Sequence, residues 1–182
     1  MKYIVSAMTS VTLLAVFSSA SISAADGTIN FKGNILDAAC IVDLDGAGAK
    51  TMDVLMGDVS KTAFTGTGST AGGSASATKF NITLKNCPET VSTAKVKFDG
   101  IAYAGDNTVL ALTNETGVAK GVGIQLADKS GEVLPLFTQS ASYNLVSGAN
   151  ANILDFYARY IQKDAAVTAG KANSVATFTV NY

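Results

Sequence analysis

Apolar and polar residues alternate in short segments along most of this chain. In the segment 79–87 the apolar residues Phe80, Ile82 and Leu84 occupy every second position, with polar side chains between them. The same alternation occurs at 94–100, 108–112, 121–128, 152–162 and 174–182, with Gly, Asn, Asp and Ser between the segments. A period of two is typical of a strand with one buried face, and no amphipathic helix of useful length is found. The pattern therefore predicts an all-β fold, an antiparallel β-sandwich in one domain.

The segment FKGNILDAAC, residues 31–40, also alternates but has no evident partner strand. Phe31, Ile35 and Ala39 fall on one side, and Gly33 falls on that same side. Between Gly33 and Cys40 there is no Pro, Asn-Gly or Asp-Gly, the residues expected in a tight hairpin turn. A continuous strand through 28–43 would exceed the usual length of about 3–10 residues. The sequence therefore provides no nearby strand with which this segment can pair.

The first residues have the pattern of a signal peptide. A short basic start, Met1 and Lys2, precedes a mostly apolar run interrupted by hydroxyl residues, and the small residues SSASISAA follow. Cleavage is expected after Ser23, or alternatively after Ala24. The apolar run is too short and too rich in hydroxyls for a membrane helix, which needs about 20 apolar residues. We expect residues 1–23 to be removed and the mature chain to be exported and soluble, with no membrane span.

The two cysteines and the charges narrow the class of protein further. Cys40 and Cys87 both lie after the expected cleavage site, and an even number of cysteines in an exported chain indicates a disulfide. Their separation matches no zinc motif, and the chain has no histidine to complete a metal site. Thirteen basic and fourteen acidic residues nearly cancel, and without a basic run nucleic-acid binding is not expected.

No set of residues has the pattern of a catalytic site. The absence of histidine removes the commonest general base and the Ser-His and Cys-His nucleophile pairs. The segment DLDGAG, residues 43–48, resembles part of a calcium loop but lacks the remaining ligands, so an Asp-Gly turn is the better interpretation. The Gly- and Ser-rich segment 66–78 lacks phosphate-loop spacing and is expected to be a loop. The sequence predicts no enzyme activity, no metal and no cofactor.

Five segments, in this order, carry a resemblance to a known family. They are GTINFKGNILDAACIV (27–42), FNITLKNC (80–87), GVGIQLAD (121–128), FYARY (156–160) and GKANSVATFTVNY (170–182). Together with the position of the two cysteines, they resemble the pilins of the chaperone–usher family, in particular those of type 1 fimbriae. The resemblance covers essentially the whole mature chain.

The resemblance implies an incomplete immunoglobulin-like sandwich that lacks its last strand. In this family a groove is left open, a periplasmic chaperone first fills it, and at the outer-membrane usher the N-terminal tail of the next subunit replaces the chaperone. The implied organisation is a signal peptide at 1–23, a donor-strand extension at 24–37 and a pilin domain at 38–182. The partners would be a periplasmic chaperone, an outer-membrane usher and neighbouring copies in a homopolymer at the cell surface.

The resemblance also assigns roles to particular residues. Cys40 and Cys87 would join the first strand to the second. The donor side chains would be Ile29, Phe31, Gly33 and Ile35, with Gly33 as the small residue that lets the incoming backbone approach closely. The acceptor groove and chaperone edge would comprise Ile41, Val42, Gly170, Phe178, Val180 and Tyr182. The residues themselves agree, because an open edge promotes association and 174–182 carry no charge.

The expected function is that of a structural fimbrial subunit, part of a surface fibre used in cell adhesion. A minor or adaptor subunit of such a fibre is an alternative that the sequence leaves open. A second alternative is a secreted carbohydrate-binding β-sandwich module, but the chain has no tryptophan, which sugar sites favour.

Overall fold

The computed structural model describes residues 27–33, 35, 39–44, 46, 48–71 and 77–182. The expected signal peptide lies outside this part of the chain. The chain divides into one unit up to Ile35 and a second from Leu36. Among the described residues no helix is long and apolar enough to cross a membrane.

The domain after the tail is built from β-strands, as the alternating pattern predicts. Within the described residues its one short helix is the 3-10 helix η1 (Lys61–Ala63). The strands are β1 (Ile41–Asp43), β2 (Thr70–Ala71), β3 (Thr78–Lys85), β4 (Thr93–Gly100), β5 (Ala102–Tyr103), β6 (Asp106–Leu110), β7 (Val122–Asp128), β8 (Tyr143–Asn144), β9 (Asn152–Gln162) and β10 (Ala176–Asn181).

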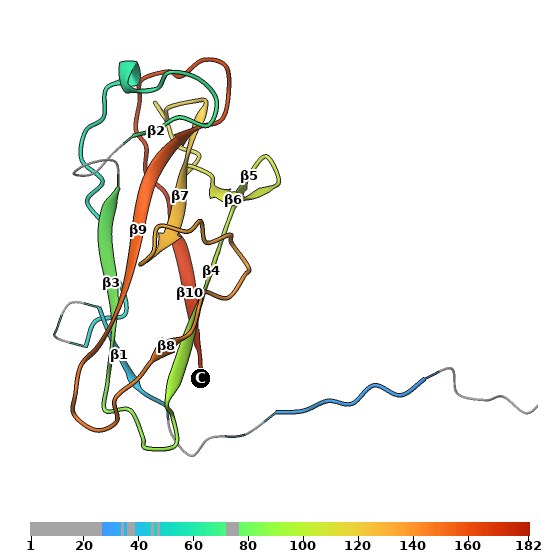
Figure 1. Cartoon of the computed structure of the whole chain (residues 1–182). Coiled ribbons are helices and arrows are strands. Elements are labelled where there is room, and N and C mark those ends of the chain that lie inside the picture. The colour runs from blue at the N-terminus through green and yellow to red at the C-terminus, as the bar shows by residue number, and fades with distance from the viewer. Residues whose placement is uncertain (1–26, 34, 36–38, 45, 47, 72–76) are drawn as a thin grey trace, which may run out of the picture. The chain divides into compact units, whose positions relative to one another are not determined.

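The strands form two antiparallel sheets (Figure 1). The larger has seven strands, in the order β1-β3-β9-β7-β6-β5 with β2 also paired to β9, and the smaller has the order β10-β4-β8. Phe80 of β3 lies opposite Phe156 of β9 in the large sheet, and Phe98 of β4 lies opposite Phe178 of β10 in the small one. The expected all-β sandwich is confirmed.

The core lies between the two sheets and is made by the alternating side chains. Ile82 and Leu84 of β3, Val96 of β4 and Phe156 of β9 are almost completely buried. The ring centroids of Phe98 and Phe156 are 5.1 Å apart with the rings nearly perpendicular, the edge-to-face arrangement that aromatic pairs prefer. Each of these side chains contributes about 1.5–3 kcal/mol by leaving water.

Two local features differ from the sequence pattern. The expected loop 66–78 contains the short strand β2, because Thr70 and Ala71 pair with Ile161 and Tyr160 of β9. Strand β7 is buried on both faces from Val122 to Ala127, whereas the pattern predicted one buried face. On the face away from the core, Arg159 binds the side chain of Gln125 and Ala127 forms a bridge with Val133, which contributes to this burial.

Asp43 holds the turn that follows β1. Its Oδ1 accepts the backbone N–H groups of Gly46 and Gly48, and its Oδ2 accepts a charge-assisted hydrogen bond from Nζ of Lys85 at 2.6 Å. These contacts, with the Lys85 bond as the main cause, lower the pKa of Asp43 to about 2. The turn is thus braced by a carboxylate within the protein.

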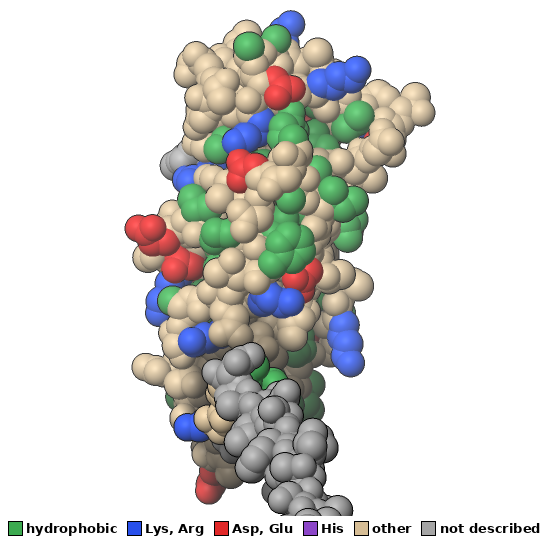
Figure 2. Space-filling view, turned by 90° about the vertical axis from the view of Figure 1, so that its right-hand side faces the viewer, with side chains coloured by type: hydrophobic (Ala, Val, Ile, Leu, Met, Phe, Trp, Pro, Cys, Tyr) green, Lys and Arg blue, Asp and Glu red, His purple; other side chains and the backbone are tan. Residues whose placement is uncertain are grey.

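Hydrophobic side chains remain on the surface of this domain. Ile101 is 78% exposed and Val175 is 74% exposed, while Phe137 has the positive φ of 65° and is also exposed. Figure 2, which views the molecule from the side on which β5 and β6 lie in Figure 1, shows hydrophobic side chains along this face between scattered charged ones.

Candidate functional site

Each sheet of the domain has an edge strand without a second partner among the described residues. Strand β1 pairs with β3 only, and strand β10 pairs with β4 only. The backbone N–H and C=O groups on their outer edges are therefore available to another strand, which is the arrangement that proteins normally protect against.

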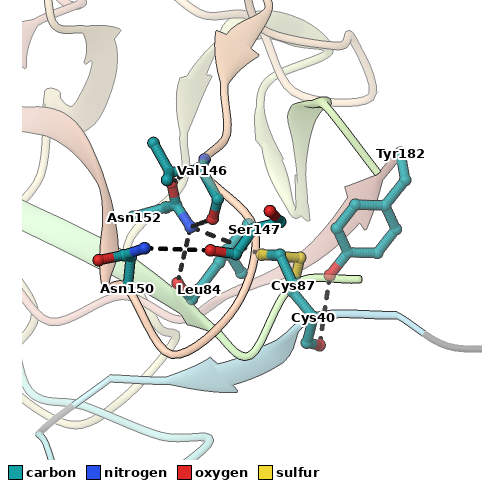
Figure 3. The surroundings of a disulfide bond; sticks show 8 residues. All are labelled: Cys40, Leu84, Cys87, Val146, Ser147, Asn150, Asn152 and Tyr182. Atoms are coloured by element: carbon teal, nitrogen blue, oxygen red, sulfur yellow. Dashed lines mark hydrogen bonds between the residues drawn. A yellow bond between two sulfur atoms is a disulfide. The ribbon is translucent and has the colours of Figure 1, made fainter. Parts of the chain in front are cut away.

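The first residue of β1 and the last residue of β10 lie at the same end of the domain. The Oη of Tyr182, which follows β10, donates a hydrogen bond of 3.4 Å to the backbone O of Cys40, which precedes β1 (Figure 3). Burial raises the pKa of Tyr182 above its usual value. The residue before β1 and the residue after β10 are thus in contact. The chain therefore enters β1 at this point and leaves β10 at the same point.

The disulfide at this end is formed as the sequence predicted. Cys40 is bonded to Cys87, just after β3, and both side chains are buried. Asn152 braces the adjacent loop, because its Nδ2 donates to Val146 O at 2.9 Å and its Oδ1 accepts from Val146 N at 2.7 Å (Figure 3). A disulfide and side-chain hydrogen bonds therefore stabilise this end of the open site.

The hydrophobic core is only partly covered next to the two edges. Phe178 and Val180 of β10 pack against the core cluster but remain partly exposed. Val42 of β1 is also partly buried against the core, and Ile41 is 53% exposed. Partly buried residues from the chain after β1 join them: Leu44, Met56, Val59 and Phe64. The flanks of the open edges are therefore apolar.

The segment 51–59, which follows β1, has an alternating burial pattern that the sequence analysis did not identify. Met52, Val54 and Met56 are partly buried while the residues between them are exposed, Leu55 to 84%. It is nevertheless not a strand, and no backbone hydrogen bond is found for it within the described part of the chain. Thr51 and Met52 line a hollow of about 460 Å³ together with Leu44 and Asp53. The period-two alternation of TMDVLM could have signalled an extended segment in need of a partner.

Gly170, which the resemblance grouped with the acceptor edge, lies against a different segment. A Cβ at this position would be 2.5 Å from Gly117 O and 2.6 Å from Ala119 N. Lys171 N donates to Gly117 O, and Ala119 N donates to Lys171 O, both at 2.8 Å. The glycine thus allows two backbones to pack closely before β10 begins, and its role in a groove stays a prediction.

The described residues of the N-terminal unit, 27–33 and 35, form no helix or strand. Ile29, Phe31 and Ile35 are 79%, 92% and 102% exposed, respectively. A Cβ placed on Gly33 would meet no atom within 4 Å. Three large hydrophobic side chains on one short segment are therefore left in solvent, which is costly unless a partner covers them.

An immunoglobulin-like sandwich of this kind is the pilin fold. Solved structures with the same fold include a type I fimbria protein of Burkholderia pseudomallei, with 38% identity and a TM-score of 0.59 over 86% of this chain and 97% of that one. The P pilus rod subunit PapA has a similar fold, with a TM-score of 0.60 over 80% of this chain and 99% of that one, at 24% identity.

Sequence comparison with curated relatives and with a family model also indicates a fimbrial protein. The model of the fimbrial protein family matches residues 29–182. The type-1 fimbrial protein A chain of Escherichia coli K12 is 39% identical over 93% of this chain and 92% of its own. The probable major fimbrial subunit LpfA of Escherichia coli O157:H7 is 33% identical over 100% of this chain and 97% of its own. The chain belongs to the fimbrial protein family.

Membership of this family establishes the general function. The chain is a structural subunit of a chaperone–usher fimbria, and it polymerises with other pilins into a fibre at the cell surface. The family is one of structural proteins, which favours a role without enzyme activity.

Proposed function

We propose that this chain is the repeating shaft subunit of its fimbria and that it polymerises by donor-strand complementation. The N-terminal segment 24–37 of one copy would lie between β1 and β10 of the domain 38–182 of the next copy. The observation that carries this proposal is the pair of free strand edges flanked by partly exposed apolar side chains. The exposed tail provides the matching apolar strand.

The backbone of the tail suits such an insertion. A strand rises about 3.3 Å per residue, so ten residues of the tail would extend over about 33 Å. Main-chain hydrogen bonds to the two free edges would supply affinity, and alternate side chains would supply specificity. Ile29, Phe31 and Ile35 share one face of an extended strand and would each contribute about 1.5–3 kcal/mol on burial.

Gly33 has the same orientation as these three residues in a strand of period two. A residue without a side chain would let the donor backbone approach the acceptor domain closely at this one point. The donor residues are then Ile29, Phe31, Gly33 and Ile35, and the acceptor edge comprises Ile41 and Val42 on one side.

The other side of the acceptor edge is the C-terminal strand. Phe178 and Val180 are its partly buried apolar residues, and Tyr182 contacts Cys40 at its end. We include the segment 51–59 in the acceptor site, because its alternating side chains face the protein while its backbone has no partner among the described residues.

The same open edges imply partners before assembly. A free subunit with an uncharged edge strand would aggregate, so a periplasmic chaperone would occupy the site after export and removal of residues 1–23. An outer-membrane usher would then exchange the chaperone for the tail of the next subunit. These steps would deliver the chain to a surface fibre used in cell adhesion.

Deletion of residues 24–35 tests the proposal. The deleted subunit should still accumulate in a complex with its chaperone, because its own acceptor edge is intact, but it should not join a growing fibre as a donor. Fibres of normal length and abundance from this variant, seen by electron microscopy, would overturn donor-strand complementation.

A minor or adaptor subunit is the second candidate for the position in the fibre. The similarity to a relative described as a probable major fimbrial subunit favours the shaft. Immunogold labelling of fibres with an antibody to this chain distinguishes the two. Labelling along the whole shaft supports the proposal, and labelling at the tip or base alone contradicts it.

A further inference from the structure

The outer face of the large sheet contains a hollow that is separate from the open edges. It has a volume of about 240 Å³, and its lining includes Ala77, Ala127, Lys129, Tyr157 and Arg159. Tyr157 lies opposite Ala127 and Arg159 opposite Gln125 in the pairing of β9 with β7. Since Leu154, Phe156 and Ala158 of β9 are the residues buried in the core, Tyr157 and Arg159 point away from it.

Arg159, the one arginine of the chain, is held in a fixed orientation. Its Nε and Nη2 donate to the same oxygen, Oε1 of Gln125, at 3.0 and 2.6 Å. Gln125 is only 7% exposed, so the pair is anchored in the sheet. A guanidinium bound along its Nε–Nη2 edge still has its Nη1–Nη2 edge for a second planar acceptor. No hydrogen bond to the described residues uses that edge.

A second cation, Lys129, lines the same hollow. Its Nζ lies 5.2 Å from the centre of the Tyr143 ring, a cation–π contact that positions the ammonium group. The nearby Asp128 is engaged elsewhere, because its Oδ1 accepts from Ser130 and from Glu132 N.

Neither Lys129 nor Arg159 forms an ion pair with a carboxylate of the described residues, whereas five other lysines do. Asp155, the acidic residue of β9, is paired with Lys79. The Asp128 carboxylate interacts electrostatically with Lys129 without forming an ion pair, so two cations share one hollow and neither is directly paired within the described residues. Such a site favours an anionic ligand, and a planar carboxylate matches the free edge of Arg159.

The rest of the lining combines apolar groups with the polar Ser130 and with Gly131, which restricts the ligand further. Tyr157, Ala77 and Ala127 offer an aromatic ring and methyl groups beside the cations. An inorganic anion would leave the ring and methyl groups uncovered, and a neutral sugar would leave the two cations without an anionic partner. The volume is below the roughly 300–1,000 Å³ of pockets for drug-sized ligands, so one sugar ring is a suitable size.

We infer that this hollow binds a carboxylate-bearing monosaccharide, with the carboxylate on Arg159 and Lys129 and the ring against Tyr157. The site belongs to the single domain and does not depend on how the subunits are joined. If the chain is the repeating subunit proposed above, a fibre carries one such site in every copy. Weak individual sites would then give strong attachment to a surface rich in acidic sugars through multivalency.

Equilibrium dialysis of radiolabelled D-glucuronate against the purified mature protein tests the site, with D-glucose and inorganic sulfate as comparison ligands. We expect saturable binding of one glucuronate per chain, weakened by added salt. The variants Arg159→Lys, which keeps the charge but loses the planar fork, and Lys129→Gln should each weaken binding by about tenfold or more. Lys120→Gln removes another exposed lysine, which does not line the hollow, and should leave binding unchanged.

Several results would overturn the inference. The first is the absence of glucuronate binding at millimolar concentration, and the second is binding of glucose or sulfate with the same affinity as glucuronate. The third is a glucuronate affinity that is the same in the Lys129→Gln variant and the original protein. Lys129 is exposed and forms no ion pair with a carboxylate that the structure describes, so its variant keeps the test valid even if substitution of Arg159 disturbs the sheet. Binding is counted per chain, so its loss is distinct from a failure of strand donation.

Discussion

A subunit that carries its own donor strand should be much more stable than one that does not. We consider a variant in which residues 24–37 are removed from the N-terminus and a copy of 26–37 is added after Tyr182 through a four-residue linker. Since Tyr182 directly follows β10, so short a linker permits only a hairpin, with the added strand antiparallel to β10 and beside its free edge. The added strand would fill the acceptor site from within the same molecule.

The magnitude follows from the three side chains that would be buried. Ile29, Phe31 and Ile35 are almost fully exposed, so their transfer contributes about 1.5–3 kcal/mol each. A matched control carries Ser at these three positions of the added copy, so that linker length and backbone are unchanged. The two proteins should then differ by about 4.5–9 kcal/mol in the free energy of unfolding. For a domain of this size each kcal/mol shifts Tm by about 2–4 °C, which gives a difference on the order of 10–30 °C.

Thermal unfolding followed by circular dichroism, with guanidinium unfolding as a second measure, checks this value. Both proteins must be monomeric by size-exclusion chromatography, so that strand exchange between molecules does not contribute. Melting temperatures within about 3 °C of each other, which corresponds to about 1 kcal/mol, would refute the reasoning. They would mean that the exposed apolar flanks of β1 and β10 are not the binding site of this strand.

Three further predictions concern single residues. The hydrogen bond from Lys85 lowers the pKa of Asp43 to about 2, so the contribution of Asp43 to stability is complete above the ordinary pKa of 3.8 and is lost as pH falls towards 2. Asp43→Asn should therefore flatten the dependence of Tm on pH between these two values. A pH profile of Tm that is unchanged in this variant would contradict the assignment. Gly170→Ala should destabilise the domain by about 1–3 kcal/mol, measured as a lower guanidinium midpoint, because its Cβ would meet Gly117 O at 2.5 Å; a midpoint equal to that of the original protein would exclude the close contact. Gly33→Leu should leave the stability of the subunit unchanged, since nothing lies within 4 Å of a Cβ there. The same variant should reduce the yield of fibres seen by electron microscopy, and full fibre assembly would argue against a close approach at this residue.

The longer strands could be predicted from the sequence because each has one face in the core. The alternation of Phe80, Ile82 and Leu84 corresponds to β3, and that of Leu154 and Phe156 corresponds to β9. The disulfide was also predictable, since an exported chain with two cysteines has a single possible intramolecular pair.

Short strands and buried polar pairs could not be predicted in this way. Strand β2 has two residues within a Gly- and Ser-rich segment, and its pairing with Ile161 and Tyr160 depends on contacts far apart in the sequence. The bond between Arg159 and Gln125 depends on the register of β7 and β9, which a single strand's pattern does not contain. Similarly, the extended segment 51–59 becomes notable only once its lack of a backbone partner within the described residues is known.

The disulfide has a mechanical consequence for a fibre under tension. If the tail of each subunit is held by its neighbour, a pulling force enters the domain just before Cys40. Strand β1 has only three residues and one partner, so a load applied at its first residue would peel it from β3 one hydrogen bond at a time. The bond to Cys87 lies ahead of β1 on this path and carries the load directly to the end of β3. Reduction of this bond should therefore lower the force at which a subunit yields, measured by pulling single fibres with and without a reductant.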